Sequence, residues 1–483
     1  MQTNQQKITK QPDLTTSSAG IGWTLLALLI VLLMGSCTPA PDQLEGQGLI
    51  VLEGVTVIDG TDAPPLVDAT VVINGDTIAA IGKKGDFSYP EDAIFMNVQG
   101  RFLMPGFIDA HTHVLEPAVS TGGQIPPRPW SAGSEKAMKT YLEYGITTIR
   151  NAGAPDSTTA VAVALRDAVA GGLVPGPRIF TAGIMIDDPG SIDKGAAHVA
   201  TEAEIREVVR SQAEAGVDYV KLYFFLSPDL VQAAIDEARL QGIMVSAHLG
   251  RTSWTDAANA GIDAIHHMCP QSAELLPEDR RAEFLAEAPG TQVVFRWFDY
   301  VDLDSPEINE LLDALVENGV SIDPTLVVWE SWFWADQPDT PEHPVSDYVA
   351  AEAIDISLKY FLGNWSDEDF DRAKAAWPTA LKFIKLLHER GVRILAGTDL
   401  PPGKPFHREL ELLVSAGIPP QEVLSIATRN AAQELGIIDE VGTIEVGKKA
   451  DIVILRANPL KEISNTREIE VVIQAGKVLA RSD

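Results

Sequence analysis

The chain has 483 residues, of which 45% are hydrophobic and 22% charged, and its formal net charge is −31. This length and composition are ordinary for a globular protein with one large domain or a few small ones. The negative charge argues against nucleic acid as a partner and against polybasic docking on an anionic membrane, because both need clustered Lys and Arg. Two cysteines, Cys37 and Cys269, leave no disulfide framework.

The N-terminal segment predicts export and tethering to a membrane. The apolar run IGWTLLALLIVLLMGS at 21–36 is short for a spanning helix but suits the core of a signal peptide. We therefore expect residues 1–36 to be a signal peptide, with an uncleaved N-terminal anchor as the alternative, and 37–47 to be a linker. Cys37 resembles the lipidated cysteine of bacterial lipoproteins, which implies a location in the bacterial cell envelope, membrane-tethered, periplasmic or extracellular.

Short β segments separated by turns occupy both flanks of the remaining chain. One flank is residues 48–104, where Asn74-Gly75-Asp76 has the sequence of a hairpin turn. The other flank is residues 441–483. We expect the two flanks to fold together into one small β-sandwich domain.

Between the flanks, apolar runs alternate with helical sequence. The runs are residues 106–114, 145–153, 177–186, 217–225, 243–250, 262–269, 320–328 and 392–399. Continuous apolar runs are typical of parallel strands buried on both faces. The helical stretches have recognisable starts, such as the capping box from Thr201 to Glu204 and the cap residue Ser227 before Pro228. The pattern predicts an α/β fold, namely a (β/α)8 TIM barrel over residues 105–440.

The first apolar run, GFIDAHTHV, ends with two histidines, His111 and His113. On a strand these alternate residues share one face, about 7 Å apart. That spacing suits two imidazoles binding one metal ion, although two satisfied polar residues on a strand would give the same pattern. The rest of the barrel has to distinguish the two interpretations.

Further polar residues fall where the other predicted strands end, which is where barrel enzymes carry their active sites. They are Lys221 in the fourth run, His248 in the fifth, His266 and His267 in the sixth, and Asp399 in the eighth. Such clustering of histidines with a lysine and an aspartate at one rim favours a metal-binding site.

A series of motifs in this order links the chain to a known family. They are MPGFIDAHTHV, GITTIRNAG, VDYVKLYFF, VSAHLG, DAIHHM, ILAGTD, LSIATRNAAQELG and GTIEVGKKADIVIL, which lie between residues 104 and 455 in a resemblance that covers residues 48–483. With these motifs the sequence resembles the amidohydrolase superfamily of metal-dependent hydrolases. The resemblance is greatest to the subset that contains Xaa-Pro dipeptidases and imidazolonepropionases.

The resemblance implies two divalent metal ions bound by side chains at the rim. The implied ligands are His111, His113, Lys221, His248, His267 and Asp399. Lys221, carboxylated by carbon dioxide, would bridge both ions as a carbamate, which requires a neutral amine. Asp399 would also be catalytic, because it would accept the proton of the attacking water and pass it to the leaving nitrogen. Zinc is the expected metal, and manganese, iron and cobalt also suit such mixed ligands.

Several of these residues have alternative interpretations. The family usually has Glu where His266 stands, so His267 matches the ligand, and His266 is expected to support a ligand or line the pocket. Lys221 could instead be a surface lysine that extends its ammonium into solvent, and without its carboxylation one metal would be expected. Asn151 stands where the family often has Asp, which leaves a charged role there in doubt. Cys269 is expected to be an inert buried thiol.

Substrate contacts are expected from the loops that follow the strands. Tyr223 can face the same pocket as Lys221 and donate to a substrate carbonyl or carboxylate, or it can be a packed core residue. Residues 329–344 are expected to form a loop over the site. Its Trp329 and Trp332 can wall an apolar pocket or pack the loop onto the barrel. His407 is expected to be a packed residue without a role in the site.

Together these features predict a hydrolase in which metal-activated water cleaves a C–N bond of a dipeptide or N-acyl amino acid. Because fold and ligands do not fix the substrate, a cyclic amide, as in imidazolonepropionases, and an ester or phosphoester remain alternatives. A non-catalytic surface protein that uses the barrel for binding is the alternative from another class. An oligomer is compatible with all of these.

Overall fold

The computed structural model describes residues 42–114, 130–153, 159–191, 195–287 and 290–479. The predicted signal peptide or anchor and the lipidation site Cys37 lie outside the described residues. Within the described ranges, no helix is both long and apolar enough to cross a bilayer.

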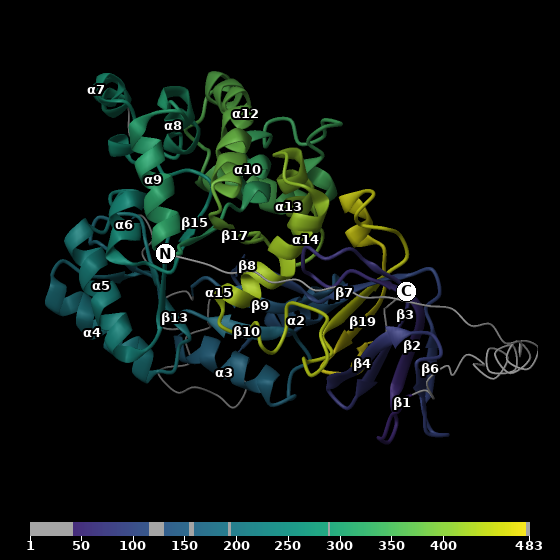
Figure 1. Ribbon diagram of the computed structural model, residues 1–483. Coiled ribbons are helices and arrows are strands. Elements are labelled where there is room, and N and C mark those ends of the chain that lie inside the picture. Colours follow the sequence, from purple (N-terminus) through teal and green to yellow (C-terminus); the bar gives the residue numbers. More distant parts are fainter. Residues whose placement is uncertain (1–41, 115–129, 154–158, 192–194, 288–289, 480–483) are drawn as a thin grey trace, which may run out of the picture.

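Strands from both flanks of the chain share one sheet, seen at the lower right of Figure 1. Its order is β20-β19-β18-β7-β2-β3-β4, with β6 also paired to β2. The strands are β2 (Ile50–Val57), β3 (Leu66–Asn74), β4 (Thr77–Lys83), β6 (Ile94–Asn97), β7 (Phe102–Pro105), β18 (Ile452–Leu455), β19 (Ile469–Gln474) and β20 (Lys477–Leu479). The antiparallel pairing of β18 with β7 connects the two flanks, and β3 and β4 form the hairpin predicted at Asn74-Gly75-Asp76. The short strands β1 (Asp42–Gln43) and β5 (Phe87–Ser88) pair separately.

Each of the eight apolar runs contains a strand, and these strands pair in parallel. They are β8 (Phe107–Thr112), β9 (Ile146–Asn151), β10 (Arg178–Thr181), β13 (Tyr219–Leu222), β14 (Met244–Ala247), β15 (Ala264–His266), β16 (Ser321–Asp323) and β17 (Arg393–Ile394). They form two sheets, β10-β9-β8 and β12-β11-β13-β14-β15-β16-β17, where β11 (Ile186–Asp187) and β12 (Ala197–His198) are short additions. Because the pairing leaves two sheets, the strand ladders alone do not close a barrel. Several contacts bridge the sheets, among them a hydrogen bond from Ala110 N to Ala396 O at 2.8 Å and an isolated bridge between Ala182 and Tyr219.

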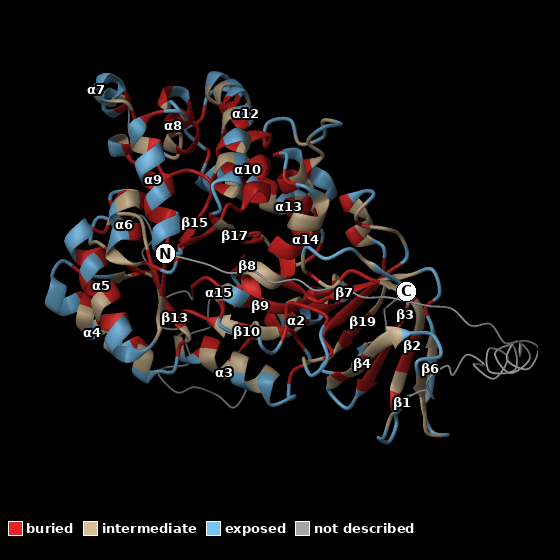
Figure 2. Cartoon of the chain, in the orientation of Figure 1, coloured by how far each residue is buried: buried red, intermediate tan, exposed pale blue. Residues whose placement is uncertain are grey.

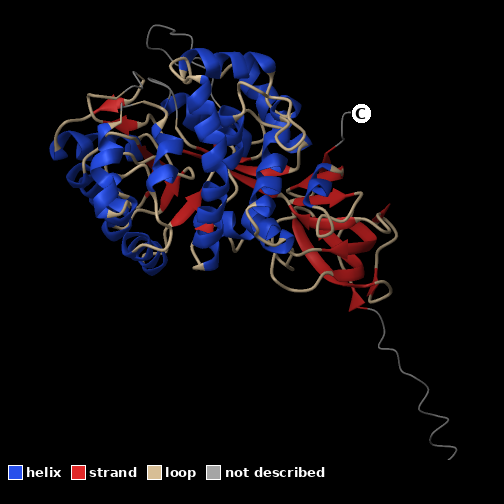
Figure 3. Ribbon diagram, turned by 90° about the horizontal axis from the view of Figure 1, so that it is seen from above, coloured by secondary structure: helices blue, strands red, loops and turns tan. Residues whose placement is uncertain are grey.

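Helices alternate with the parallel strands and cover them, as Figure 3 shows in blue around the red strands. They are α2 (Ala132–Glu143), α3 (Thr159–Ala170), α4 (Glu202–Glu214), α5 (Pro228–Gln241), α6 (Trp254–Ala260), α7 (Glu278–Ala286), α8 (Val293–Tyr300), α9 (Pro306–Glu317), α10 (Leu326–Phe333), α11 (Ala351–Tyr360), α12 (Asp367–Glu389), α13 (Lys404–Ser415), α14 (Pro420–Ser425) and α15 (Ala431–Glu434). The predicted capping box at Thr201 is present, and Ser227 with Pro228 begins α5 as predicted.

The seventh run was predicted to be one continuous strand followed by a loop, and the structure differs from this prediction. Only Ser321–Asp323 is a strand, and α10 begins three residues later at Leu326. Pro324 has no N–H to continue the ladder, and Thr325 turns the chain with a left-handed φ of 47°. A short apolar run such as LVVW fits a buried helix as well as a strand. Trp329 and Trp332 therefore lie on a helix.

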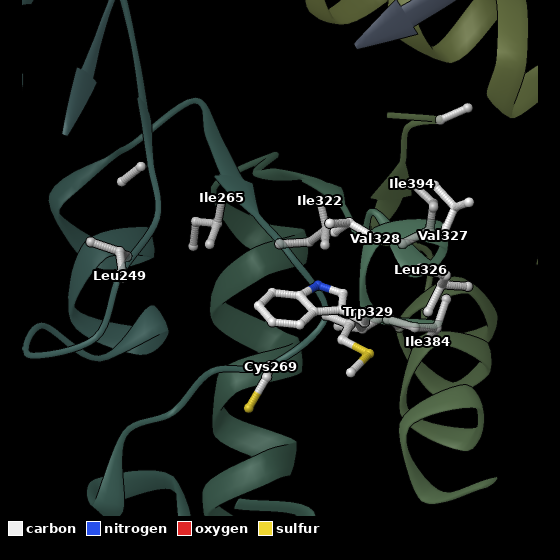
Figure 4. Close-up of a cluster of buried hydrophobic side chains, with 14 of the residues drawn as sticks. Leu249, Ile265, Cys269, Ile322, Leu326, Val327, Val328, Trp329, Ile384 and Ile394 are labelled. Carbon is white, nitrogen blue, oxygen red and sulfur yellow. The ribbon is translucent and has the colours of Figure 1, made fainter. Parts of the chain in front are cut away.

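The core lies between the parallel strands and the helices, where Figure 2 shows the strands buried. Ile265, Ile322 and Ile394 come from three neighbouring strands and are almost inaccessible to solvent. They belong to the same apolar cluster as Ile384 of α12, part of which is drawn in Figure 4. This packing holds the strand ends, and so the rim, in fixed positions.

The sheet shared by the two flanks gives a test of how much the C-terminal strands stabilise the protein. Ile452 of β18 is fully buried in this sheet's own core, so Ile452→Ala should lower the free energy of unfolding by about 2–5 kcal/mol. The exposed Val446, on the same flank, provides the control, and Val446→Ala should change it by less than about 0.5 kcal/mol. Denaturant titration measures both, and equal effects would contradict the packing.

Candidate active site

The residues predicted at the rim come together where the parallel strands end. The imidazole of His111 lies close to His113 and Asp399. The Asp399 Oδ1 lies 3.2 Å from His113 Nε2 and 3.7 Å from His111 Nε2. The ring of His267 is 5.0 Å from the ring of His111 and 4.2 Å from that of His248. Four imidazoles and one carboxylate therefore form one continuous cluster.

Lys221 of β13 lies inside the fold beside this cluster. Its side chain is 1% exposed, so the alternative of a surface lysine is wrong. Burial lowers the pKa of Lys221 to about 7, although the nearby carboxylates Asp323 and Asp399 act in the opposite direction. A substantial fraction of this amine is therefore neutral at physiological pH, which is the form that can react as a nucleophile.

The imidazoles are held so that their Nε2 atoms face the cluster. The Nδ1 of His111 lies 2.7 Å from Asp323 Oδ1, and that of His267 lies 2.8 Å from Thr325 Oγ1. The Nδ1 of His113 lies 3.3 Å from the carbonyl oxygen of Gly153. A histidine whose Nδ1–H donates to such a partner keeps the lone pair of Nε2 free, as metal ligands require.

Burial also keeps three of the imidazoles uncharged. The pKa values of His111, His248 and His267 are lowered well below the usual value, mainly because burial penalises the imidazolium. For Asp399, burial alone would raise the pKa, but His111, His113 and Lys221 outweigh it and hold the pKa at about 2. The cluster therefore presents neutral nitrogens and an ionised carboxylate, which are donors of the kind that divalent transition metals bind.

The carboxylate of Asp323, at the end of β16, holds residues of this cluster by hydrogen bonds. This role was not predicted from the sequence. The carboxylate accepts hydrogen bonds from Arg150 Nη2 at 2.6 Å and pairs with the Nδ1 atoms of His111 and His266, each at 2.7 Å. The guanidinium of Arg150 also donates, through Nε, to the carbonyl of Ala110 at 2.6 Å. A charged residue within the apolar run VSIDPTLVV was the signal that could have revealed Asp323.

Two of the candidate ligands have a strained backbone conformation. His267 has a φ of 75° and Asp399 a φ of 52°, a left-handed conformation that is unfavourable for residues with a Cβ. Asp109 stabilises the Asp399 turn, since its carboxylate accepts from Thr398 Oγ1 at 2.9 Å and from the backbone N–H groups of Thr398 and His111 at 3.2 Å. The segments that carry Asp399 and His111 are thereby locked together.

Among the residues that the structure describes, two groups of side chains have the spacing of a metal site. In the first, donor atoms of His111, His113 and Asp399 lie within 4.8 Å of one another, and their free Nε2 atoms fit a metal ion. The second is His111, His266 and Asp323. Its short contacts are hydrogen bonds to a carboxylate that already pairs with the Arg150 guanidinium, so we assign this group to support of the ligands rather than to a cation.

The residues predicted to contact substrate occupy different depths. His266 is fully buried, and its ring is 4.4 Å from the ring of His111. Tyr223 lies nearer the rim, with its ring 5.2 Å from that of His248. Trp329 is 4% exposed and packs its ring 5.4 Å from His267, while Trp332 lies between Trp329 and Phe361.

Other residues flagged in the sequence lie apart from the cluster. His407 is a buried packing residue, as expected, with its Nδ1 3.0 Å from Thr466 Oγ1. Cys269 is a buried thiol whose pKa is raised by burial, so it is unreactive, as expected. Asn151 is buried. Its side-chain N–H donates to Thr181 Oγ1 at 2.9 Å, and its side-chain oxygen accepts from the Val114 N–H at 3.2 Å.

Gln271 was not indicated by any sequence pattern, and it lies against His248 of the cluster.

The donors gathered at the rim are of the kind found in metal-binding enzymes, and comparison with known proteins gives the family. The profile of the Amidohydrolase family matches residues 102–479, so the chain belongs to the amidohydrolase family, whose hydrolases act on C–N bonds and generally bind metal.

Curated relatives cover most of the chain. Ochratoxinase of Aspergillus niger is 23% identical over 90% of this chain and 86% of its own length. Imidazolonepropionase of Alkaliphilus oremlandii is 24% identical over 86% of this chain and 92% of its own length. Among solved structures, a Xaa-Pro dipeptidase with bound methionine shares the fold, with a TM-score of 0.65 and 22% identity over 89% of this chain and 100% of that one.

The role of Asp323 can be tested by removing its charge at constant size. Asp323→Asn leaves the Arg150 guanidinium buried without its counter-ion, which should cost about 3–5 kcal/mol of folding free energy. It should also weaken metal binding by about 10–100-fold: if the remaining oxygen stays on Arg150 and His266, the new NH2 group faces His111 Nδ1, which then lacks the acceptor that orients it. Competition with a metal chelator measures the affinity. Glu317→Gln on the exposed end of α9 is the control, and unchanged affinity in Asp323→Asn would contradict the assignment.

Proposed function

We propose that this amidohydrolase uses metal-activated water to cleave the C–N bond of a dipeptide or N-acyl amino acid. The observation that carries the proposal is the cluster of Nε2 atoms around Asp399, with Lys221 buried beside it. No other grouping within the described residues combines free imidazole donors, an ionised carboxylate and a buried lysine. The substrate class follows the Xaa-Pro dipeptidase and ochratoxinase relatives, and also an envelope location, where peptides would be met.

We infer two metal positions. The ligands would be His111, His113 and Asp399 for the first ion, His248 and His267 for the second, and Lys221 as the shared carbamate. When bound, two divalent ions would acidify a water molecule and polarise the scissile carbonyl. Zinc is the expected metal, with manganese, iron or cobalt as alternatives. The low pKa of Lys221 supports the carbamate, because only a neutral amine adds carbon dioxide.

The side chains around the metal positions would divide the remaining work. Asp399, ionised at all physiological pH values, would accept the proton of the attacking water and pass it to the leaving nitrogen. Tyr223, beside His248, would donate to a substrate carbonyl or carboxylate. Trp329 and Trp332 would form an apolar wall behind His267. His266 would act indirectly: it pairs with Asp323 and packs against His111, and so helps to hold His111 in position.

The surrounding architecture is part of the same proposal. The two parallel sheets would be arcs of one (β/α)8 barrel over residues 105–440, with 48–104 and 441–483 as a composite β-sandwich domain beside it. Residues 1–36 would direct export as a signal peptide or remain as an anchor, and Cys37 would be lipidated in the first case. The catalytic part would then lie outside the bacterial cytoplasmic membrane, tethered to it.

Metal content tests the paired centre directly. Elemental analysis of the purified 48–483 fragment should give about two equivalents of metal per chain, and Lys221→Ala should lower this to about one, because the bridge is lost. Lys382→Ala, at an exposed position of α12, is the control and should keep two. One equivalent in the native chain, unchanged by Lys221→Ala, would indicate a single-metal enzyme. Cyclic amides, the substrates of imidazolonepropionases, would then be the first substrates to test.

The proton role of Asp399 gives a second test. Asp399→Asn keeps an oxygen ligand but removes the base, so turnover should fall about 10²–10⁴-fold while metal stays bound. Asp313→Asn, on the exposed face of α9, is the control. Turnover and metal content are measured together on a panel of dipeptides and N-acyl amino acids. Unaltered turnover in Asp399→Asn would contradict the mechanism, and absence of turnover in the native, metal-loaded chain would favour a non-catalytic binding protein.

A further inference from the structure

Gln271 sits in a strained turn next to the candidate metal site. The turn follows β15 and contains two residues with left-handed φ, His267 at 75° and Gln271 at 59°. This conformation is costly for residues with a Cβ, and such strain persists where the surroundings enforce it, often at functional sites. The turn is anchored on its far side, because the carbonyl of Ser272 accepts from Trp297 Nε1 at 2.9 Å.

The turn directs the amide of Gln271 at a candidate metal ligand. Gln271 Nε2 lies 3.3 Å from His248 Nε2, and Gln271 is 5% exposed. Because an amide N–H can only donate, His248 Nε2 acts as the acceptor and its proton lies on Nδ1. This is the tautomer in which Nε2 can bind a metal ion. Once a metal takes that lone pair, the amide N–H needs another acceptor in the same place.

The oxygen of the same amide lacks a partner. Gln271 Oε1 is buried, and no donor among the described residues reaches it. A buried acceptor without a hydrogen bond is unfavourable, so such an atom indicates a missing donor. With His248 engaged by metal, the side chain would present one free donor and one free acceptor side by side. A trans secondary amide can donate its N–H to the free acceptor, while its C=O points the opposite way and stays available for polarisation by the metal ions.

We propose that Gln271 is a specificity-determining residue that accepts the N–H of the substrate's amide and selects secondary amides. The inference rests on the proposed function and adds to it the kind of amide that is cleaved. An N-substituted amide, including the bond before proline, has no N–H to donate, so in this respect the chain would differ from its Xaa-Pro dipeptidase relative. Such a substrate would leave Oε1 buried and unpaired, and the enzyme should discriminate against it.

The test compares matched substrates that differ by one N-methyl group. The probes are N-acetyl-phenylalanine with N-acetyl-N-methyl-phenylalanine, and glycyl-leucine with glycyl-N-methyl-leucine. In the native protein, kcat/KM should favour the N–H member by about tenfold or more. In Gln271→Met, which keeps the length of the side chain without its polar atoms, the ratio should fall to about that of N-methylation alone, within about twofold of unity. Gln433→Met, at an exposed position of α15, should keep the native ratio.

Because a ratio between two substrates does not depend on the fraction of folded protein, impaired folding of Gln271→Met would not imitate the effect. A binding measurement complements it: calorimetric Kd values of the N-acetyl pair in the Asp399→Asn background should show the same preference, lost on adding Gln271→Met. An unchanged ratio in Gln271→Met overturns the inference while leaving the proposed function intact. If the metal-loaded native protein hydrolyses neither pair, the proposed function itself fails, and the inference fails with it.

Discussion

The rest of the site depends on the hydrogen bonds and charge pairing of the buried Asp323 carboxylate. An isolated carboxylate inside a protein is strongly unfavourable, and pairing is what makes it tolerable. Here one guanidinium and two imidazole nitrogens surround it, from Arg150, His111 and His266. These partners come from β9, β8 and β15, so a single charge fixes three strand ends relative to β16. Because Asp323 also sets the tautomer of His111, the same contact makes Nε2 available at the rim.

The strained residues at the rim are stabilised by the same strands. The N–H of Asp399 donates to the carbonyl of His111 at 2.8 Å, and the N–H of His267 donates to the carbonyl of Asp323 at 2.7 Å. Each left-handed residue is therefore tied by its backbone to a strand that carries a ligand or its support. The cost of the unfavourable φ is offset by fold-wide hydrogen bonding, and the side chains gain an orientation that a regular strand end would not give.

The sequence predicted those features that depend on local patterns. Continuous apolar runs located the eight parallel strands, and the spacing of His111 and His113 identified the rim, because period and position in a strand are readable along the chain. Asp323 and Gln271 were not identified, because their roles arise from contacts with residues 212 and 23 positions away. Helix α10 was missed because its apolar run has the composition of a buried strand, and only Pro324 and the turn at Thr325 separate the two.

Charge balance explains how so polar a cluster is stable inside the fold and what it can accept. Counted in their ionised forms and without metal, the buried cations Lys221 and Arg150 balance the two carboxylates of Asp323 and Asp399, one charge each. Burial raises the pKa of both Asp109 and Asp323 to about 8, but only Asp323 faces Arg150 and Lys221, which favour its ionised form. Carboxylation of Lys221 would replace a positive charge by a negative one and leave an excess of two negative charges. Two divalent ions would reverse that excess, and the hydroxide formed on acidification of a bound water would reduce it again. A carbamate without metal, or two metals without a carbamate, would each leave a larger uncompensated charge in the interior, so the two changes are expected to occur together.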